Sequence, residues 1–344
     1  MKKILVTGAA GFIGYHLVAR LLGDGCSVVG IDNLNDYYSV ELKLARLKEL
    51  GIESHKADYG EELQSTQYPD FRFIKADITD REFLPKLFRS EQFDAVVNLA
   101  AQAGVRYSLE NPFAYVESNV VGFLNILECC RHNTVKHLLY ASSSSVYGSN
   151  NKIPFSEHDE VNSPESLYAA TKRSDELMAS VYSKLYGIPS TGLRFFTVYG
   201  PWGRPDMAPM LFADAISVGQ PIKLFNGGDM ARDFTYIDDI VDGIVRVLTV
   251  PPTKNIQDRP HAIYNIGCSQ PVMLAEFIAE IEGALGLTAE RIEMPMQAGD
   301  VVRTYADTSL LEQQFGYRPT TPLHEGIRIF IDWYKTYYNK TIHQ

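Results

Sequence analysis

The first half of the chain alternates short apolar runs with segments in which apolar residues recur at helical spacing. Phe12, Ile13, Leu17 and Val18 show that spacing after the first run. Short apolar runs without polar alternation are typical of strands buried on both faces. The order therefore predicts an α/β fold with a parallel sheet and right-handed crossovers. We expect strands at Lys3 to Thr7, Ser27 to Ile31, Phe71 to Ala76, Ala95 to Leu99, His137 to Ala141 and Thr191 to Phe195.

The pattern becomes less regular after Phe196, where prolines and a Gly227-Gly228 turn interrupt shorter elements. We therefore expect residues 1–196 to form the first domain and residues 197–344 to form a smaller, mixed α/β lobe that binds substrate. Within that second half, segment 234–266 is expected to pack back on the first domain. A long excursion between Asp32 and Phe71 contains a charged amphipathic helix that ends at Gly51.

A glycine-rich turn follows the first predicted strand, with glycines at Gly8, Gly11 and Gly14. The missing side chains let the backbone approach a pyrophosphate at the N-terminus of the next helix. Asp32 ends the second predicted strand, where an acid can bind the adenosine ribose hydroxyls. This context predicts a doubly wound, Rossmann-type dinucleotide site. The Asp32 carboxylate would repel a 2′-phosphate and no cation follows it before Lys43, which favours NAD over NADP.

A second set of chemical groups lies near the middle of the chain. Tyr168 and Lys172 are four residues apart, so they share one helix face and the ammonium can stabilise a phenolate. Four hydroxyls, Ser142 to Ser145, follow a predicted buried strand, and ligands of open α/β sheets bind at strand carboxyl ends. A solvated helix face and a capped turn are the plain alternatives. The three features together favour a proton-transfer site.

These motifs together resemble the extended short-chain dehydrogenase/reductase family, and within it the nucleotide-sugar epimerases. The resemblance covers nearly the whole chain and implies Ser143, Tyr168 and Lys172 as the catalytic set. The family's cofactor-binding positions fall on Gly8, Gly11, Phe12, Ile13, Gly14, Asp32, Asn33, Asp77, Ile78, Leu99, Ala100, Ala101 and Asn119, with Tyr168 and Lys172 also contacting NAD.

The run from Arg194 to Ala208 narrows the implied substrate. It resembles UDP-glucuronate 4-epimerases, in which Thr197 and Arg204 would hold the sugar carboxylate; a surface arginine is the alternative for Arg204. A guanidinium fork suits a carboxylate. The resemblance further assigns UDP-sugar contacts to Arg106, Ser143, Ser145, Arg232 and Arg303. Many relatives have arginine where Gln297 stands, so Arg303 is the candidate replacement.

The implied reaction is inversion at C4. Tyr168 removes the proton of the 4-hydroxyl as a hydride leaves for NAD, and the hydride returns to the other face of a transient 4-keto sugar. Related decarboxylases and dehydratases place an acid beside the strand-end hydroxyl, where this chain has Ser144 and Ser145. The alternatives, in order, are a 4-epimerase of a neutral UDP-hexose, a UDP-glucuronate decarboxylase and a non-catalytic NAD sensor.

Composition excludes several classes of partner. The 344 residues carry 32 basic and 42 acidic side chains, a formal charge of −10, so we expect neither nucleic acid nor membrane as a partner. The four cysteines and eight histidines lack metal-ligand spacing, and we expect no metal. With no secretory or membrane-spanning pattern, a cytoplasmic location is expected. Family resemblance implies a homodimer through helices 112–131 and 165–187.

Overall fold

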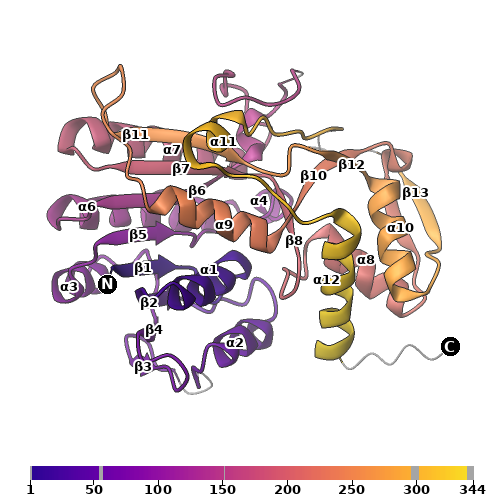
Figure 1. The fold of residues 1–344 in the computed structure, drawn as a ribbon, viewed down its shortest axis with the longest axis horizontal. Coiled ribbons are helices and arrows are strands. Elements are labelled where there is room, and N and C mark those ends of the chain that lie inside the picture. Colours follow the sequence, from indigo (N-terminus) through magenta and orange to yellow (C-terminus); the bar gives the residue numbers. More distant parts are fainter. Residues whose placement is uncertain (1, 54–56, 151, 296–301, 339–344) are drawn as a thin grey trace. The chain divides into compact units, whose positions relative to one another are not determined.

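The apolar runs that we predicted as strands belong to one large sheet in the computed structural model (Figure 1). The structure describes residues 2–53, 57–150, 152–295 and 302–338. Its strand order is β11-β7-β6-β5-β1-β2-β4-β3. The strands are β1 (Lys3–Thr7), β2 (Ser27–Asp32), β3 (Glu62–Gln64), β4 (Phe71–Lys75), β5 (Ala95–Asn98), β6 (His137–Ser143), β7 (Ser190–Phe195) and β11 (His261–Ile266). The six strands from β4 to β7 pair in parallel, and β3 joins antiparallel to β4. The predicted α/β, Rossmann-type fold is confirmed.

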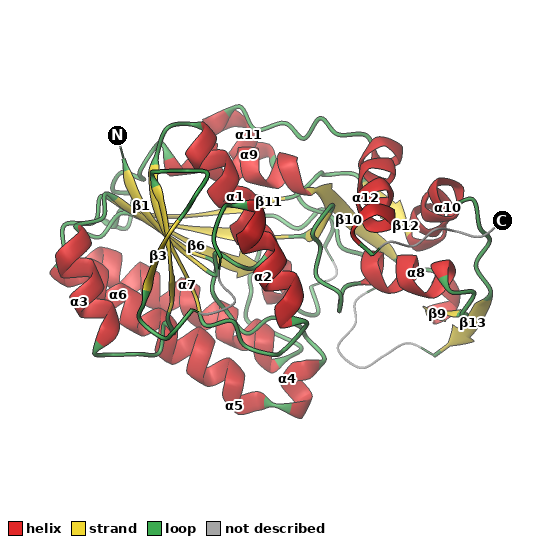
Figure 2. Cartoon of the chain, turned by 90° about the horizontal axis from the view of Figure 1, so that it is seen from below, coloured by secondary structure: helices red, strands yellow, loops and turns green. Residues whose placement is uncertain are grey.

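Helices cover both faces of this sheet, as its edge-on view shows, with α1 and α9 on one face and α3, α6 and α7 on the other (Figure 2). The helices are α1 (Phe12–Gly23), α2 (Val40–Glu49), α3 (Phe83–Glu91), α4 (Tyr107–Glu110), α5 (Pro112–Tyr115), α6 (Phe123–His132), α7 (Leu167–Tyr186) and α9 (Ile237–Leu248). Aliphatic and aromatic side chains from β1, β2, β4, β5, β6, α3 and α6 form a continuous core between the sheet and the second helical layer. Burial of this apolar area is the main driving force for the layered fold.

Two local predictions need correction. The segment Pro112 to Arg131 was expected to be one helix, but a π-helical stretch, η2 (Val116–Gly122), separates α5 from α6. Strand β6 is also longer than predicted, because Ser142 and Ser143 pair with Arg194 and Phe195 of β7. Both departures place polar side chains at the carboxyl edge of the sheet.

Contacts divide the chain into two compact units. The first contains Met1–Asn150, Asp159–Phe195 and Val241–Tyr264, and the second contains Asn151–His158, Phe196–Ile240 and Asn265–Gln344. Residues 151–158 therefore group with the second unit, although the sequence placed them within the first domain. The chain enters the first unit again along α9 and leaves it along β11.

The second unit contains two small sheets, ordered β12-β10-β8 and β13-β9. Its strands are β8 (Thr197–Tyr199), β9 (Ile222–Phe225), β10 (Ala231–Tyr236), β12 (Pro271–Met273) and β13 (Arg291–Met294). Its helices are α8 (Ala208–Ser217), α10 (Leu274–Leu285), α11 (Ser309–Phe315) and α12 (Leu323–Tyr337). Asp233 anchors this unit: its buried carboxylate accepts backbone N–H groups from Cys268, Ser269 and Ala306 at 2.6–3.1 Å.

Candidate active site

The glycine turn between β1 and α1 has the shape that a bound pyrophosphate needs. Gly8 has a positive φ of 71°, which favours glycine. A Cβ at Gly14 would lie 2.0 Å from the carbonyl oxygen of Gly8, so no side chain fits there. No side chain caps the start of α1 at Gly11, which leaves the first N–H groups of the helix for an anion. The turn therefore fits a dinucleotide diphosphate.

Asp32 lies at the end of β2, against this turn. Its Oδ2 accepts the N–H of Ala10 at 3.2 Å and its Oδ1 accepts the N–H of Leu34 at 2.9 Å. On the neighbouring strand end, Asp77 accepts the side-chain amide of Asn33 at 2.8 Å. Two of the predicted cofactor acids are thus fixed at adjacent strand ends, where an adenosine ribose and its base would lie in this fold.

Two buried cations of α2 were not predicted to lie near this edge. Arg46 Nη1 donates to the carbonyl of Ala10 and to the Tyr38 hydroxyl, both at 2.8 Å. Lys43 donates to the carbonyl and side-chain oxygens of Asn35. The excursion between Asp32 and Phe71 therefore braces the glycine turn, a role that the charged sequence of its helix did not reveal.

Ser143, Tyr168 and Lys172 come from the end of β6 and the start of α7. Ser166 begins that helix, because its side chain accepts the N–H of Ala169 at 3.1 Å. Lys172, one turn after Tyr168, is 2 % exposed and donates to the carbonyl of Ala141 at 2.9 Å. This bond joins the helix to β6 two residues before Ser143. The structure thus brings Lys172, the predicted catalytic lysine, beside the strand that carries Ser143, the predicted catalytic serine.

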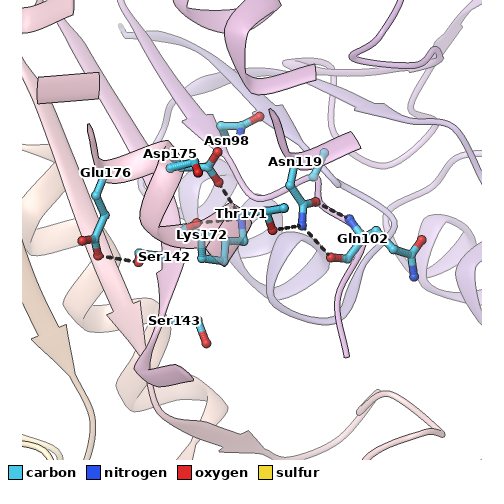
Figure 3. A network of polar contacts seen from close by, with 12 residues as sticks. Asn98, Gln102, Asn119, Ser142, Ser143, Thr171, Lys172, Asp175 and Glu176 are labelled. Atoms are coloured by element: carbon cyan, nitrogen blue, oxygen red, sulfur yellow. Dashed lines mark hydrogen bonds and ion pairs between the residues drawn. The ribbon is translucent and has the colours of Figure 1, made fainter. Parts of the chain in front are cut away.

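The hydroxyls of the serine cluster have different partners. Ser142 is buried and donates to Glu176 Oε1 at 2.6 Å, whereas Ser143 Oγ accepts both the N–H and the hydroxyl of Ser145, at 3.2 and 2.9 Å. Successive residues of a strand face opposite sides, so Ser142 points to α7 and Ser143 does not. Ser143 and Ser145 therefore form a hydroxyl pair at the end of β6. Figure 3 shows Ser142 bonded to Glu176 and Ser143 pointing elsewhere.

Asn119 lies in the π-helical segment and holds two parts of the site together (Figure 3). Its Oδ1 accepts the N–H of Gln102 at 2.8 Å, and its Nδ2 donates to the Gln102 carbonyl and to Thr171 Oγ1, both at 3.0 Å. Thr171 in turn donates to the carbonyl of Tyr168 at 2.8 Å. Such π-helical turns are frequent at functional sites. We predicted Asn119 as a cofactor contact; its side chain positions the loop after β5 and the helix of Tyr168.

A buried ion pair joins α7 to β7. Arg194 of β7 donates to Glu176 through Nε and Nη2, at 2.8 and 3.0 Å, and to the Tyr147 hydroxyl at 3.0 Å. Burial raises the pKa of Glu176, but the hydrogen bonds and charge of Arg194 outweigh it and hold that pKa below its usual value. This pair could not be predicted from the sequence, because charged residues on a helix are ordinarily exposed.

The remaining cofactor candidates cluster at the same sheet edge. Leu99 to Ala101 follow β5, and the N–H of Ala100 donates to Thr7 Oγ1 at 3.0 Å. Ile78 follows β4 and is buried, while Phe12 and Ile13 form the first turn of α1. Arg106, a substrate candidate of the first unit, precedes α4 and is exposed.

The other substrate candidates lie in the second unit. Thr197 begins β8, and Arg204 forms a bidentate ion pair with Asp206 at 3.0 and 2.5 Å. Arg232 on β10 donates to the carbonyls of Ala231 and Val302, and the exposed Arg303 bridges to Ala231 through the backbone. Gln297 lies outside the described residues. These assignments remain predictions.

Comparison with known proteins identifies the family. Residues 4–267 match the model of the NAD dependent epimerase/dehydratase family. The chain belongs to that family. It is 45 % identical to a probable UDP-glucuronate 4-epimerase of Rhizobium meliloti, over 98 % of both chains, and 50 % identical to protein CapI of Staphylococcus aureus, over 98 % of this chain and 100 % of that one.

A solved structure gives the same result. The UDP-glucuronic acid 4-epimerase of Bacillus cereus, in complex with UDP-glucuronic acid and NAD, superposes with a TM-score of 0.85 at 34 % identity, over 98 % of this chain and 100 % of that one. The resemblance to epimerases is thus confirmed.

In the part of the chain that the structure describes, no helix is both long and apolar enough to span a membrane.

The glycine turn makes a direct prediction. Gly14→Ala should abolish retention of NAD and lower the melting temperature, because the added methyl group would meet only backbone atoms of Gly8 and Ala9. Gly23→Ala is the matched control in the same helix, since a Cβ there meets no atom within 4 Å. NAD content by absorbance and thermal unfolding measure both variants. Normal NAD content in Gly14→Ala would contradict the role of the turn.

Proposed function

We propose that this protein is an NAD-dependent UDP-glucuronate 4-epimerase, which interconverts UDP-glucuronate and UDP-galacturonate. The observation that carries the proposal is the arrangement of Tyr168 and Lys172 on one face of α7, with Lys172 bonded to the strand of Ser143. Binding of UDP-glucuronic acid and NAD by the relative from Bacillus cereus supports the choice of substrate and cofactor.

Each catalytic residue has a separate task in this proposal. The glycine turn, Asp32 and Asp77 would hold NAD, which would supply a reversible hydride acceptor for C4 of the sugar. Tyr168 takes the proton of the 4-hydroxyl and gives it back, which is general base and then general acid catalysis. The Lys172 ammonium stabilises the phenolate, and the hydroxyl of Ser143 orients the reacting oxygen. The sugar is not oxidised overall, so the cofactor should stay bound.

Arg204 and Thr197 are proposed to hold the sugar carboxylate. The guanidinium of Arg204 already forms a planar, two-bond contact with the carboxylate of Asp206, which is the geometry that a uronic acid would offer. Arginine has five N–H donors, so a second carboxylate can be accepted beside the first. The serines at 144 and 145, in place of an acid, favour epimerisation over loss of CO₂.

The test is to incubate the purified holoenzyme with UDP-glucuronate, UDP-glucose or UDP-N-acetylglucosamine and to resolve the products by NMR. We expect UDP-galacturonate from the first and little conversion of the other two. Preferred conversion of UDP-glucose would support a neutral-hexose epimerase, and a UDP-pentose product would support a decarboxylase. The absence of any product together with bound NAD would support a sensor.

We also propose a homodimer formed through helices 112–131 and 165–187, which correspond to α5, η2, α6 and α7. Large exposed apolar side chains lie on α5, η2 and α7: Phe113, Val116, Leu177, Val181 and Leu185. Leu109 on the preceding helix, α4, is also exposed. Clustered apolar residues on an exposed surface are typical of a protein interface.

A cytoplasmic location remains a prediction of the sequence.

The dimer makes a measurable prediction. The double variant Leu177→Glu with Val181→Glu should sediment as a monomer, because four-residue spacing places both carboxylates on one exposed face of α7. Val250→Glu, at another exposed apolar position, is the control and should remain dimeric. Sedimentation velocity separates the two states. A dimeric double variant would remove α7 from the interface.

A further inference from the structure

A buried carboxylate lies directly beneath the catalytic lysine and has no assigned role. Asp175 is 1 % exposed, and its Oδ2 accepts a hydrogen bond from Lys172 Nζ at 3.2 Å (Figure 3). Its other oxygen, Oδ1, is buried without a hydrogen-bond partner among the described residues. A half-satisfied buried carboxylate is costly, so its presence beside the reacting groups calls for a reason.

The surroundings of Asp175 contain few other charges. On α7 it is close to Lys172 and Glu176, and Glu176 is paired with Arg194 of β7. From β6, the buried phenol of Tyr140 is within its electrostatic reach. The side chains of Asn98 and Asn119, from β5 and η2, are drawn in the same view and carry no charge (Figure 3). Lys172 is therefore the cation with which Asp175 forms its ion pair.

The charge of Asp175 changes within the working range of pH. Burial raises the pKa of this carboxyl to about 7, Lys172 opposes that rise and Glu176 adds to it. Above that pH the carboxylate balances the ammonium of Lys172 in a site from which water is excluded. Without the carboxylate, the Lys172 ammonium would keep the carbonyl of Ala141 as an acceptor but would lose its only charged one among the described residues.

We propose that Asp175 is a positioning residue whose carboxylate directs the Lys172 ammonium at the active site through their ion pair. The ammonium has three N–H donors, and two of them bond to the carbonyl of Ala141 and to Asp175. The orientation of the remaining N–H follows from those two bonds. This inference rests on the proposed function, because it acts through proton transfer at Tyr168.

The experiment compares the pH dependence of kcat for the wild-type holoenzyme and Asp175→Asn with UDP-glucuronate between pH 5.5 and 9.5. We expect nearly equal rates at pH 6, where the wild-type carboxyl is protonated, and a loss of about tenfold or more at pH 9. The alkaline limb should therefore move to lower pH by roughly one unit. A uniform loss at every pH, or an unshifted limb, would overturn the proposal.

Two further variants keep the test decisive. If Asp175→Asn does not retain NAD, Asp175→Ser is measured with the same expectation, because a smaller hydroxyl leaves room for water. If neither variant retains NAD, Asp175 is only structural and the proposal is wrong. Asp175→Glu retains the carboxylate and should restore the alkaline limb. Failure of that rescue with normal NAD content would also count against a charge-based role.

Controls separate this inference from the proposed function. Ser174→Ala removes a neighbouring hydroxyl that donates to the helix carbonyl of Ala170, and it should leave the pH profile unchanged. In a Lys172→Met background, adding Asp175→Asn should have no further effect on turnover, since the two residues act as one unit. A wild-type enzyme inactive on UDP-glucuronate would refute the proposed function. An active wild type with an unshifted Asp175→Asn profile would refute only the role of Asp175.

Discussion

Tyr168→Phe should lower turnover of UDP-glucuronate by at least ~10²-fold, the usual contribution of a positioned acid–base group. The ring itself is retained, so its edge-to-face contact with Tyr115, at 6.1 Å between centroids, should persist. Folding and NAD content should therefore match those of the wild type. The backbone of Tyr168 is held independently by Thr171, so the loss would report the hydroxyl alone.

Tyr182→Phe is the matched control, because it removes a phenolic hydroxyl from the same helix at a distance from the site. That hydroxyl bonds to Glu128, and its loss should leave kcat within about twofold. Rapid kinetics with absorbance of the reduced nicotinamide would follow the chemical step in both variants. Turnover near the wild-type rate in Tyr168→Phe would exclude this residue as the base.

The sheet and the cofactor edge could be predicted because their signals are local in sequence. Apolar runs, the glycine turn and Asp32 identify strand, turn and strand end without knowledge of distant residues. The paired strands β1, β2, β5 and β6 then bring their carboxyl ends together through parallel register. The fold thus follows from patterns that span fewer than about twenty residues each.

The supporting charges could not be predicted in the same way. Glu176 and Asp175 follow Lys172 on α7, and an isolated helix with this pattern would be expected to expose them. Strands β6 and β7 give Glu176 buried partners in Ser142 and Arg194. The partner of Asp175 is Lys172 of the same helix, whose side chain is held by Ala141 of β6. Helical periodicity also gives no warning of η2, since a π-helical turn adds one residue without changing composition.

The predicted substrate contacts have a different status, because they depend on the family resemblance rather than on local physics. Arg204 lies in a loop between β8 and α8, and its pairing with Asp206 is the geometry that the structure adds. An arginine pre-oriented by a carboxylate loses less conformational freedom when it binds a second one. That pairing gives the carboxylate assignment a physical basis that can be tested on two substrates.

Arg204→Ala should reduce kcat/KM for UDP-glucuronate by roughly 30-fold or more. Loss of one partner from a buried, charge-assisted pair costs ~2–5 kcal/mol, and 1.4 kcal/mol corresponds to a factor of ten. UDP-glucose has no carboxylate, so its already low kcat/KM should change by less than about threefold. The measured quantity is the ratio of the two values, because a folding defect would lower both together.

Arg318→Ala is the control for that ratio, since it removes an exposed arginine of the same unit from an ion pair with Glu312. It should leave both substrates unaffected. Arg204→Lys should give an intermediate ratio, because an ammonium retains the charge but cannot form the two parallel bonds of a guanidinium. If Arg204 also holds the carboxylate of the 4-keto sugar in place and so hinders loss of CO₂, Arg204→Ala should release more UDP-pentose. An unchanged ratio in Arg204→Ala would instead remove the main physical support for glucuronate and make a neutral UDP-hexose the better substrate.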